Sequence, residues 1–145
     1  MKVAKAMTAD VQIASPSQTI KEAARTMGQL DAGSLPVGEN DRLVGMITDR
    51  DIAVRAVAQG LGPDTPVRKV MSAEVKYCFE DEDIGEVADN MGEIKVRRLP
   101  VLNRSKRLVG IVSLGDIARA DNGSAADAMR DIAEPGGAHS QSADA

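Results

Sequence analysis

An internal two-fold repeat constrains the fold of this chain more than any other feature of its sequence. Three blocks recur in the same order: residues 6–8 at 70–72, 35–37 at 99–101, and 42–48 at 107–113. The first two blocks recur after 64 residues and the third after 65, so one residue is inserted in a turn, where insertions are tolerated. The chain therefore contains two copies of one supersecondary unit.

The two copies have the same predicted order of elements. In the first copy, apolar residues at helical spacing over 20–30 follow Thr19, and Glu22 completes a capping-box pattern. Around this helix we predict a strand at 11–14, strands at 34–37 and 43–48, and a second helix at 52–59. Each copy is thus β-α-β-β-α, which predicts an α+β fold of two pseudo-symmetric repeats packed face to face.

Composition indicates where the copies begin and end. We expect the first copy at 1–60, a Gly- and Pro-containing linker at 61–69, the second copy at 70–121 and an acidic tail at 122–145. The tail consists mainly of Gly, Ser, Ala and Asp. We therefore expect it to be disordered, and a brief helix at 125–133 is the alternative.

The net charge of −4 arises entirely at the C-terminal end, because residues 121–145 hold five acidic side chains and one Arg. The balanced remainder predicts no general attraction to nucleic acid or to an anionic membrane. A basic cluster without acidic residues lies at 95–107. We interpret this cluster as a solvated hairpin, and nucleic-acid binding is its weaker alternative.

Rare residue types exclude several classes of site. The single Cys78 and the single His139 exclude an internal disulfide and a zinc site built from Cys and His alone. Tyr77 and Phe79 are the only aromatic residues, which excludes a broad stacking platform for single-stranded nucleic acid. The lone thiol, and a first ten residues without a long apolar run, predict a cytoplasmic protein.

The pattern Gly-x-x-Thr/Ser-x-x-Asp closes the last strand of each copy. It places Thr48 three residues before Asp51, and Ser113 three residues before Asp116. One interpretation is a capping box, in which the hydroxyl and the carboxylate accept from free backbone N–H groups at a helix start. Without further context, this interpretation is favoured.

The other interpretation of the same pattern is a ligand site. A helix start suits phosphate oxygens, and a carboxylate one turn further can accept both hydroxyls of a ribose. Apolar strand residues such as Ile13 or Tyr77 could flank a flat base. The two interpretations are compatible, because the carboxylate could cap the empty site and bind ribose when a ligand is present.

The repeated Leu-Pro-Val, Leu-Val-Gly and Gly-x-x-Thr/Ser-x-x-Asp blocks resemble a tandem pair of CBS domains, named after cystathionine β-synthase. The resemblance covers about residues 1–120 and is strongest to small stand-alone bacterial proteins with two CBS domains. It implies a disc-shaped homodimer. It also implies clefts between the repeats that bind adenosine compounds such as AMP, ADP, ATP, S-adenosylmethionine or NADH.

The resemblance also implies roles for individual residues. Asp51 and Asp116 would hold ribose hydroxyls, with Thr48 and Ser113 beside them. The backbone that would line the base pockets lies at Ile13, Ala14, Tyr77 and Cys78.

Arg98 stands directly before Leu-Pro-Val, where several nucleotide-binding relatives have an Arg that contacts phosphate. The first copy has Ser34 at this position, so the two clefts should differ. The alternative for Arg98 is an ordinary charge on a surface strand.

The sequence contains no recognisable nucleophile–base pair, Walker loop or metal-ligand cluster, so we expect no enzymatic activity. The leading hypothesis is a regulatory module without a required cofactor. It binds an adenine nucleotide and transmits occupancy to an unknown protein target or to its own oligomeric state, which we expect to be a homodimer. The alternative is a ligand-free scaffold in which the two motifs only cap helices.

Overall fold

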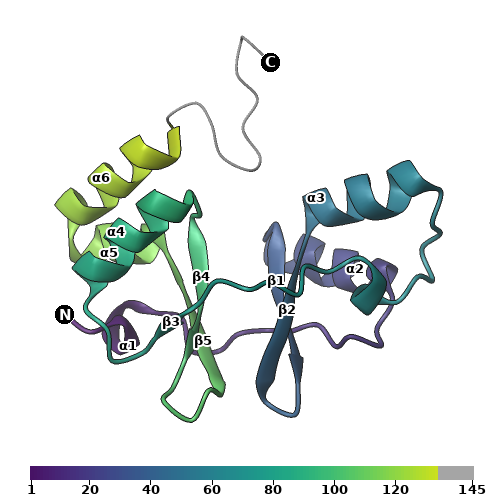
Figure 1. Cartoon of the computed structure of the whole chain (residues 1–145), viewed down its shortest axis with the longest axis horizontal. Helices are drawn as coiled ribbons and strands as arrows, with labels where there is room; N and C mark the ends of the chain where they lie inside the picture. Colours follow the sequence, from purple (N-terminus) through teal and green to yellow (C-terminus); the bar gives the residue numbers. More distant parts are fainter. Residues whose placement is uncertain (134–145) are drawn as a thin grey trace. The chain divides into compact units, whose positions relative to one another are not determined.

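A computed structural model describes residues 1–133 of the chain, apart from the side chain of Asn122 (Figure 1). The chain forms two compact units. Among the described residues, unit 1 contains 1–11, 77–105 and 109–133, and unit 2 contains 12–76 and 106–108. The first eleven residues therefore pack with the second sequence copy, and the segment up to residue 76 packs with the first.

Unit 2 is built on one hairpin and two helical segments. Its elements are α2 (Ile20–Leu30), β1 (Ser34–Glu39), β2 (Arg42–Thr48), α3 (Asp49–Asp51) with its continuations η1 (Ile52–Ala56) and η2 (Val57–Gln59), and the short η3 (Val67–Lys69). β1 and β2 pair antiparallel, with Ser34 opposite Thr48. Asn40 and Asp41 have φ angles of 55° and 62°, which is the backbone of a two-residue hairpin turn. The predicted helix at 20–30 and the predicted hairpin are confirmed.

Two predictions for unit 2 are wrong in detail. The strand expected at 11–14 is reduced to one parallel bridge between Ala14 and Val37. The helix expected at 52–59 begins earlier, at Asp49, and has π geometry over Ile52–Ala56 before a final 3-10 turn. Thr19 accepts from the Glu22 N–H as predicted, at 3.1 Å.

Unit 1 carries the same plan with one additional helix at each end. Its elements are α1 (Val3–Ala6), β3 (Cys78–Phe79), α4 (Ile84–Ile94), β4 (Arg98–Leu102), β5 (Leu108–Ser113), α5 (Leu114–Ala120) and α6 (Asn122–Ala133). The sheet order is β3-β4-β5, and β3 is parallel to β4, with Cys78 opposite Val101. The predicted α+β class with two similar repeats is confirmed.

The recurring Met-Thr/Ser block has the same role in both units, because it pairs with the edge of the Leu-Val-Gly strand. In unit 1, Thr8 and Ile111 exchange two backbone hydrogen bonds of 2.8 and 2.9 Å. In unit 2, Ser72 and Met46 exchange two bonds of the same lengths. Each sheet is thus completed by the block that precedes the other sequence copy.

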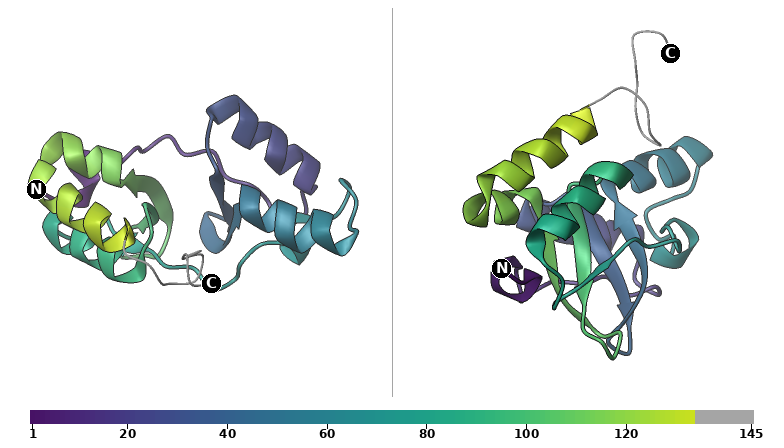
Figure 2. Two further views of the ribbon diagram at one scale, coloured as in Figure 1. Left: turned by 90° about the horizontal axis from the view of Figure 1, so that it is seen from above. Right: turned by 60° about the vertical axis from the view of Figure 1, so that its left-hand side comes forward.

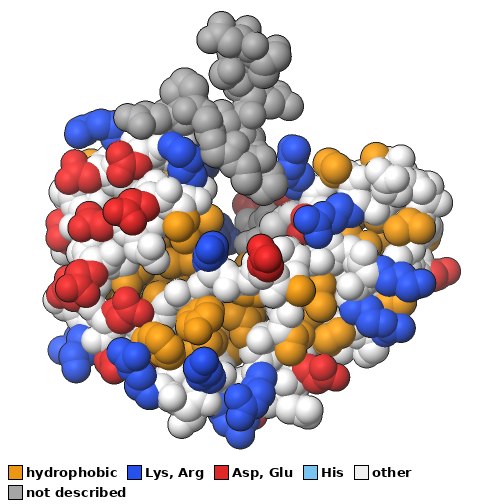
Figure 3. Space-filling model, in the orientation of Figure 1, with side chains coloured by type: hydrophobic (Ala, Val, Ile, Leu, Met, Phe, Trp, Pro, Cys, Tyr) orange, Lys and Arg blue, Asp and Glu red, His pale blue; other side chains and the backbone are white. Residues whose placement is uncertain are grey.

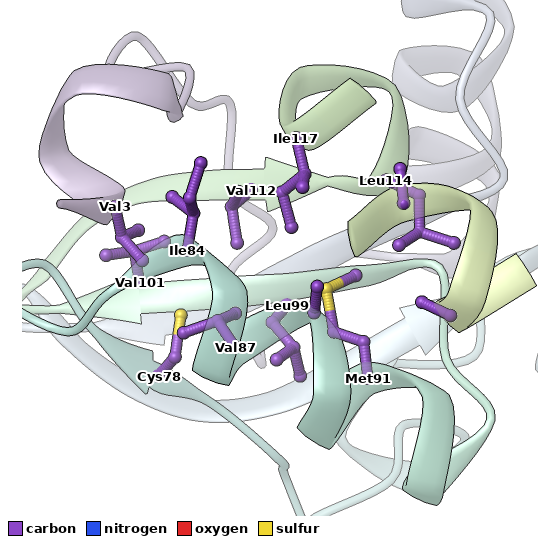
Figure 4. Packing of buried hydrophobic residues seen from close by; sticks show 13 residues of the cluster. Val3, Cys78, Ile84, Val87, Met91, Leu99, Val101, Val112, Leu114 and Ile117 are labelled. Atoms are coloured by element: carbon purple, nitrogen blue, oxygen red, sulfur yellow. The ribbon is translucent and has the colours of Figure 1, made fainter. Parts of the chain in front are cut away.

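Each unit has its own aliphatic core. In unit 1, Figure 4 shows Val3, Ile84, Met91, Leu99, Val112 and Ile117 among the packed side chains. The unit 2 core contains Ile20, Met27, Leu35, Val37, Ile47, Val67 and Val70. Aliphatic side chains dominate both, as the near absence of aromatic residues predicts.

α6 corrects the expectation of a disordered tail from residue 122. It spans Asn122–Ala133, begins before the brief helix considered at 125–133, and lies against α4 and α5 (Figure 2). Ala125 and Ala128 are buried in the unit 1 core. Residues 134–145, including His139, lie outside the described residues.

Candidate functional site

The corner between β2 and α3 holds Thr48 and Asp51 in a closed hydrogen-bonded pair. The Thr48 hydroxyl oxygen accepts from the Asp51 N–H at 2.9 Å, and the Asp51 Oδ2 accepts from the Thr48 N–H at 3.0 Å. The Asp51 side chain is 15% exposed. The three-residue spacing alone dictates this geometry, because both bonds close within one helical turn.

The corner between β5 and α5 repeats this arrangement in unit 1. The Ser113 hydroxyl oxygen accepts from the Asp116 N–H at 3.1 Å, and the Asp116 Oδ2 accepts from the Ser113 N–H at 3.0 Å. Asp116 is the more deeply buried of the two acids, with 8% of its side chain exposed. The capping interpretation of the repeated pattern is therefore confirmed at both corners.

In each corner the second carboxylate oxygen faces an Arg from the same helical segment. The Asp51 Oδ1 lies 3.8 Å from the Arg55 Nε, and the Asp116 Oδ1 accepts from Arg119. Capping thus occupies one carboxylate oxygen and leaves the other to a half-exposed or exposed guanidinium. Each ion pair is thus half-buried, because the Arg side chains are 53% and 74% exposed whereas the carboxylates are 15% and 8% exposed.

Sequence reasoning missed both of these arginines, although their spacing from the aspartates was visible. Arg119 follows Asp116 by three residues and Arg55 follows Asp51 by four, which are the spacings that meet on a helix. The two corners are not identical, since the Arg55 Nη1 also donates to the carbonyl oxygens of Val70 and Met71 at 3.4 and 3.3 Å. Arg55 is thereby tied to a second segment of unit 2.

The other predicted residues of unit 2 lie in the segment that bridges to β1, and β1 in turn pairs with the corner strand β2. Ala14 is buried, donates its N–H to the Pro36 carbonyl and accepts from the Gly38 N–H, both at 2.9 Å. Its neighbour Ile13 is 44% exposed, so its side chain is available for contact. A role of either residue beside a base stays a prediction.

The corresponding pair in unit 1 separates in the same way. Cys78 is buried, with 2% exposure, whereas Tyr77 is 38% exposed and its ring packs edge-on against Phe79 at 5.6 Å between centroids. Burial, with a smaller contribution from Glu82, raises the pKa of the Cys78 thiol to about 12. Any contact of Cys78 with a ligand would therefore be through its backbone.

Arg98 lies beside the unit 1 corner. It is the exposed first residue of β4, and the carbonyl of the preceding Arg97 accepts from the Leu114 N–H at 3.0 Å. This bond brings the start of β4 to the start of α5, within one residue of Ser113. The placement agrees with the predicted role of Arg98, which stays a prediction.

Three of the six basic side chains at 95–107 have local polar partners, namely Lys95, Arg104 and Arg107. Arg104 donates two bonds of 2.9 Å to Asp81, which lower the pKa of that carboxyl, and stacks 4.1 Å above the Phe79 ring. The Lys95 Nζ donates to the Asp131 carbonyl at 2.6 Å. In Figure 3, acidic side chains gather over the helices of unit 1. These features favour the solvated hairpin over nucleic-acid binding.

Within residues 1–133, no three His, Cys, Asp or Glu side chains are grouped so as to hold a metal ion. No helix in this part of the chain has the length and apolar character needed to cross a membrane.

The sequence matches one family and several small proteins. The family described as CBS domain matches residues 3–57 and again residues 67–123. The CBS domain-containing protein YhcV of Bacillus subtilis is 44% identical over 128 residues, which cover 87% of this chain and 91% of the relative. Hypoxic response protein 1 of Mycobacterium tuberculosis is 41% identical over 115 residues, covering 78% and 80% of the two chains.

Two solved structures extend the similarity to the fold. A crystal structure of Hypoxic Response Protein I with two coordinated zinc ions has a TM-score of 0.75 and 39% identity, and the match covers 82% of this chain and 98% of that one. The CBS domain pair of protein MJ0100, in complex with 5′-methylthioadenosine and S-adenosyl-L-methionine, has a TM-score of 0.70 and 31% identity. That match covers 85% of this chain and 97% of the other.

Proposed function

Because the chain belongs to the CBS domain family, with a copy of the domain in each half, we propose that its two strand-to-helix corners bind the ribose of an adenosine-containing ligand. The observation that carries this proposal is the split use of each carboxylate. The Oδ2 atoms of Asp51 and Asp116 cap a helix, whereas their Oδ1 atoms face the side chain of an Arg that is more than half exposed.

A ribose presents two neighbouring hydroxyls, and both donate to the same carboxylate in this proposal. One hydroxyl takes the place of the Arg at Oδ1, and the other uses the second lone pair of the capping Oδ2. The corner keeps its own hydrogen bonds when the ligand binds. Burial of both carboxylates strengthens these charge-assisted bonds relative to bonds in water.

The ligand class is supported by the similarity to protein MJ0100, whose CBS domain pair is in complex with two adenosine-containing compounds. AMP, ADP, ATP and S-adenosylmethionine share the adenosine group that the corners would bind. No cofactor is required by the proposal, and the adenine compound acts as a regulatory ligand rather than as a substrate.

Regulation follows if the ligand binds two arrangements of the chain with different affinity, because occupancy then shifts their populations. The receiver is a protein target or the oligomeric state of the chain itself, which we propose to be a homodimer. We propose a cytoplasmic module on the single unpaired thiol of Cys78, which fits a compartment where thiols stay reduced.

A ligand-free scaffold is the second candidate. It is favoured by one observation, namely that both capping boxes are complete without a ligand. Ligand-dependent stabilisation separates the two candidates. A ligand that binds only the folded chain raises its stability, whereas a scaffold that binds no adenosine compound gains none.

We expect adenosine compounds to raise the melting temperature of the wild-type chain. A ligand at a hundred times its Kd stabilises the folded state by about 2.7 kcal/mol, which is roughly 5–10 °C for a chain of this size. In Asp51→Asn/Asp116→Asn, each amide oxygen still caps its helix but one acceptor per corner is lost, so the shift should disappear. Thermal denaturation with adenosine, AMP, ATP and S-adenosylmethionine measures this.

The matched control is Asp83→Asn, which changes an N-cap acid of α4 that lies outside both corners and should keep the full shift. A second control uses 2′-deoxyadenosine, which lacks one of the two hydroxyls and should give no shift. Equal shifts for adenosine and its 2′-deoxy analogue would refute recognition of the ribose hydroxyls. No shift with any of the compounds would favour the ligand-free scaffold.

Arg98→Ala should weaken AMP binding about tenfold and leave adenosine binding unchanged. The reason is that a guanidinium–phosphate bond at an exposed position contributes on the order of 1.5 kcal/mol, and adenosine has no phosphate. Calorimetric titration of both ligands gives the ratio. Arg97→Ala, the same change at the adjacent exposed residue, should affect neither ligand, and equal losses for AMP and adenosine in Arg98→Ala would contradict a phosphate contact.

A further inference from the structure

We propose that an open apolar hollow on unit 2 binds a small amphipathic anion, namely a carboxylate carried on an unbranched aliphatic chain. The hollow has a volume of about 450 Å³ and is lined by α2, the helical run at 49–59 and the linker that follows this run. This size is within the range of sites for small organic ligands. Neither Thr48 nor Asp51 lines the hollow, so the inference goes beyond the proposed nucleoside binding.

The walls of the hollow are mainly apolar. Ile20 is buried and Ile52 is half-buried, whereas Val57 and Leu61 are 69% and 41% exposed, and all four side chains line the hollow. Exposed aliphatic surface is costly in water, and an aliphatic chain that covers it gains free energy in proportion to the area removed from water. The walls therefore predict a ligand with an apolar body.

Backbone hydrogen bonds fix the segments that bound the hollow. The Lys21 N–H donates to the Pro63 carbonyl at 3.2 Å and holds the linker against the start of α2. Gly60 has a φ of 78° and turns the chain out of the helical run. Directly after it, the Leu61 N–H donates to the Ala56 carbonyl at 2.9 Å. The fold thus forms the hollow in advance, and a ligand does not have to order its walls.

Two cations, Lys21 and Arg25, line the same hollow. They are four residues apart on α2, a spacing at which like charges repel, and Lys21 is the second residue of the helix, where the dipole disfavours a positive charge. None of the ion pairs within residues 1–133 involves either side chain. The neighbouring Glu22 accepts instead from the Thr19 hydroxyl at 3.2 Å. An anion in the hollow would neutralise this local excess of positive charge.

The combination of two cations with apolar walls selects the class of anion. Lys and Arg at exposed positions commonly lay their aliphatic stems on apolar surface and keep the charged ends in water, where a carboxylate can accept from both. A carboxylate has no polar group beyond its charged end, so its chain can cover the apolar walls. A nucleotide or a sugar phosphate also carries hydroxyls that aliphatic walls cannot satisfy.

Unit 1 fills the corresponding space with its own helix. The residues 64 positions after Lys21 and Arg25 are Gly85 and Asp89, so neither cation recurs. A Cβ atom on Gly85 would lie 3.8 Å from the Ser124 Oγ of α6, the helix that packs against α4. The hollow and its two charges are therefore specific to unit 2 and are not a requirement of the repeated fold.

Calorimetric titration with hexanoate, octanoate and decanoate below their micelle-forming concentrations tests the proposal. Each carboxylate should saturate one site per chain. The affinity should rise about two- to fourfold per added methylene, fourfold being the value for full burial. Decyltrimethylammonium, with the chain of ten carbons and the opposite charge, should not bind. Titrations that do not saturate, or an affinity independent of chain length, would overturn the proposal. Binding to phosphatidylglycerol vesicles without binding of decanoate would also overturn it and would indicate a membrane-docking surface.

A pair of charge variants tests the role of the two cations. Lys21→Gln/Arg25→Gln should weaken decanoate binding about tenfold, because both charge-assisted contacts are lost. Arg42→Gln/Lys76→Gln is the matched control, since it removes the same net charge from exposed residues of unit 2 that do not line the hollow. This control should keep the wild-type affinity. Equal losses in the two double variants would show a general charge effect and contradict a site at the hollow.

A pair of valine variants tests the apolar wall. Val57→Asp places a carboxylate in the hollow and should weaken decanoate binding about tenfold. Val54→Asp introduces the same side chain at a 45% exposed residue of the same helical run, outside the hollow, and should have no effect. Equal affinities of the two Asp variants would overturn the proposal. Asp51→Asn/Asp116→Asn should bind decanoate as the wild type does, so this site and the proposed nucleoside sites are tested separately.

Discussion

Gly110→Val is expected to lower the free energy of unfolding by about 3 kcal/mol, because it forces side-chain volume into the contact between β5 and the N-terminal segment. A Cβ atom on Gly110 would lie 2.7 Å from both the Met7 Sδ and the Thr8 carbonyl oxygen. The Met7 side chain can move, but the Thr8 carbonyl accepts from the Ile111 N–H at 2.9 Å and is fixed by the sheet. Relief of the clash therefore requires loss of strand pairing as well as repacking.

Unit 2 offers a second instance of the same contact. A Cβ atom on Gly45 would lie 2.7 Å from the Met71 Sδ and 2.8 Å from the Ser72 carbonyl oxygen, so Gly45→Val should have a similar cost. Gly62→Ala is the control, since nothing lies within 4 Å of its Cβ position. Urea denaturation followed by circular dichroism compares the three variants, and a cost below about 1 kcal/mol for both Val variants would show that the segments pack differently.

The Met-Thr/Ser block and the glycine recur together in the sequence, but this recurrence predicted no contact between them. What the sequence could not reveal is which copy each block joins. The hydrogen bonds of Thr8 with Ile111 and of Ser72 with Met46 connect residues far apart in the chain, and no local pattern encodes such pairings. Residues 1–11 therefore join the second copy through tertiary contacts, which only the structure reveals.

The capping bonds at the two corners were predictable because they depend only on nearby residues. Long-range packing was not predictable because it has no local pattern. The bonds between Thr48 and Asp51, and between Ser113 and Asp116, close within three residues, so spacing and residue type suffice to predict them. The π geometry over Ile52–Ala56 has no such local signal. In this segment Arg55 reaches the carbonyls of Val70 and Met71, a contact across fifteen and sixteen residues.

α6 shows how tertiary packing overrides composition. Its Ala, Gly, Ser and Asp content is typical of a disordered segment, yet Ala125 and Ala128 are small enough to approach α4 closely where Gly92 has no side chain. The helix is thus stabilised by a surface that lies 36 residues earlier in the chain, as the bond from Lys95 to Asp131 illustrates. The composition of the tail alone does not include α4, the helix against which α6 packs.

The largest kinetic effect is expected at Cys78, whose thiol should react with iodoacetamide at pH 8 about a thousandfold more slowly in the folded chain than in urea. Burial raises the pKa of this thiol from its ordinary 9.0 to about 12, and the negative charge of Glu82 acts in the same direction. Only the thiolate is the nucleophile, so three pKa units remove about three powers of ten in reactive form. Figure 4 shows the Cys78 sulfur among the core side chains, which also restricts access of the reagent.

The same pKa shift predicts a pH dependence of stability with a definite sign. The unfolded thiol ionises as the pH rises above 9, while the folded thiol stays protonated until about pH 12, so this contribution to stability is complete below pH 9 and is lost as the pH rises towards 12. Cys78→Ala removes this contribution, and its urea midpoint should therefore fall less between pH 8 and pH 10 than that of the wild type. Equal alkylation rates with and without urea would show that β3 does not bury its thiol, and the register of Cys78 opposite Val101 would then be wrong.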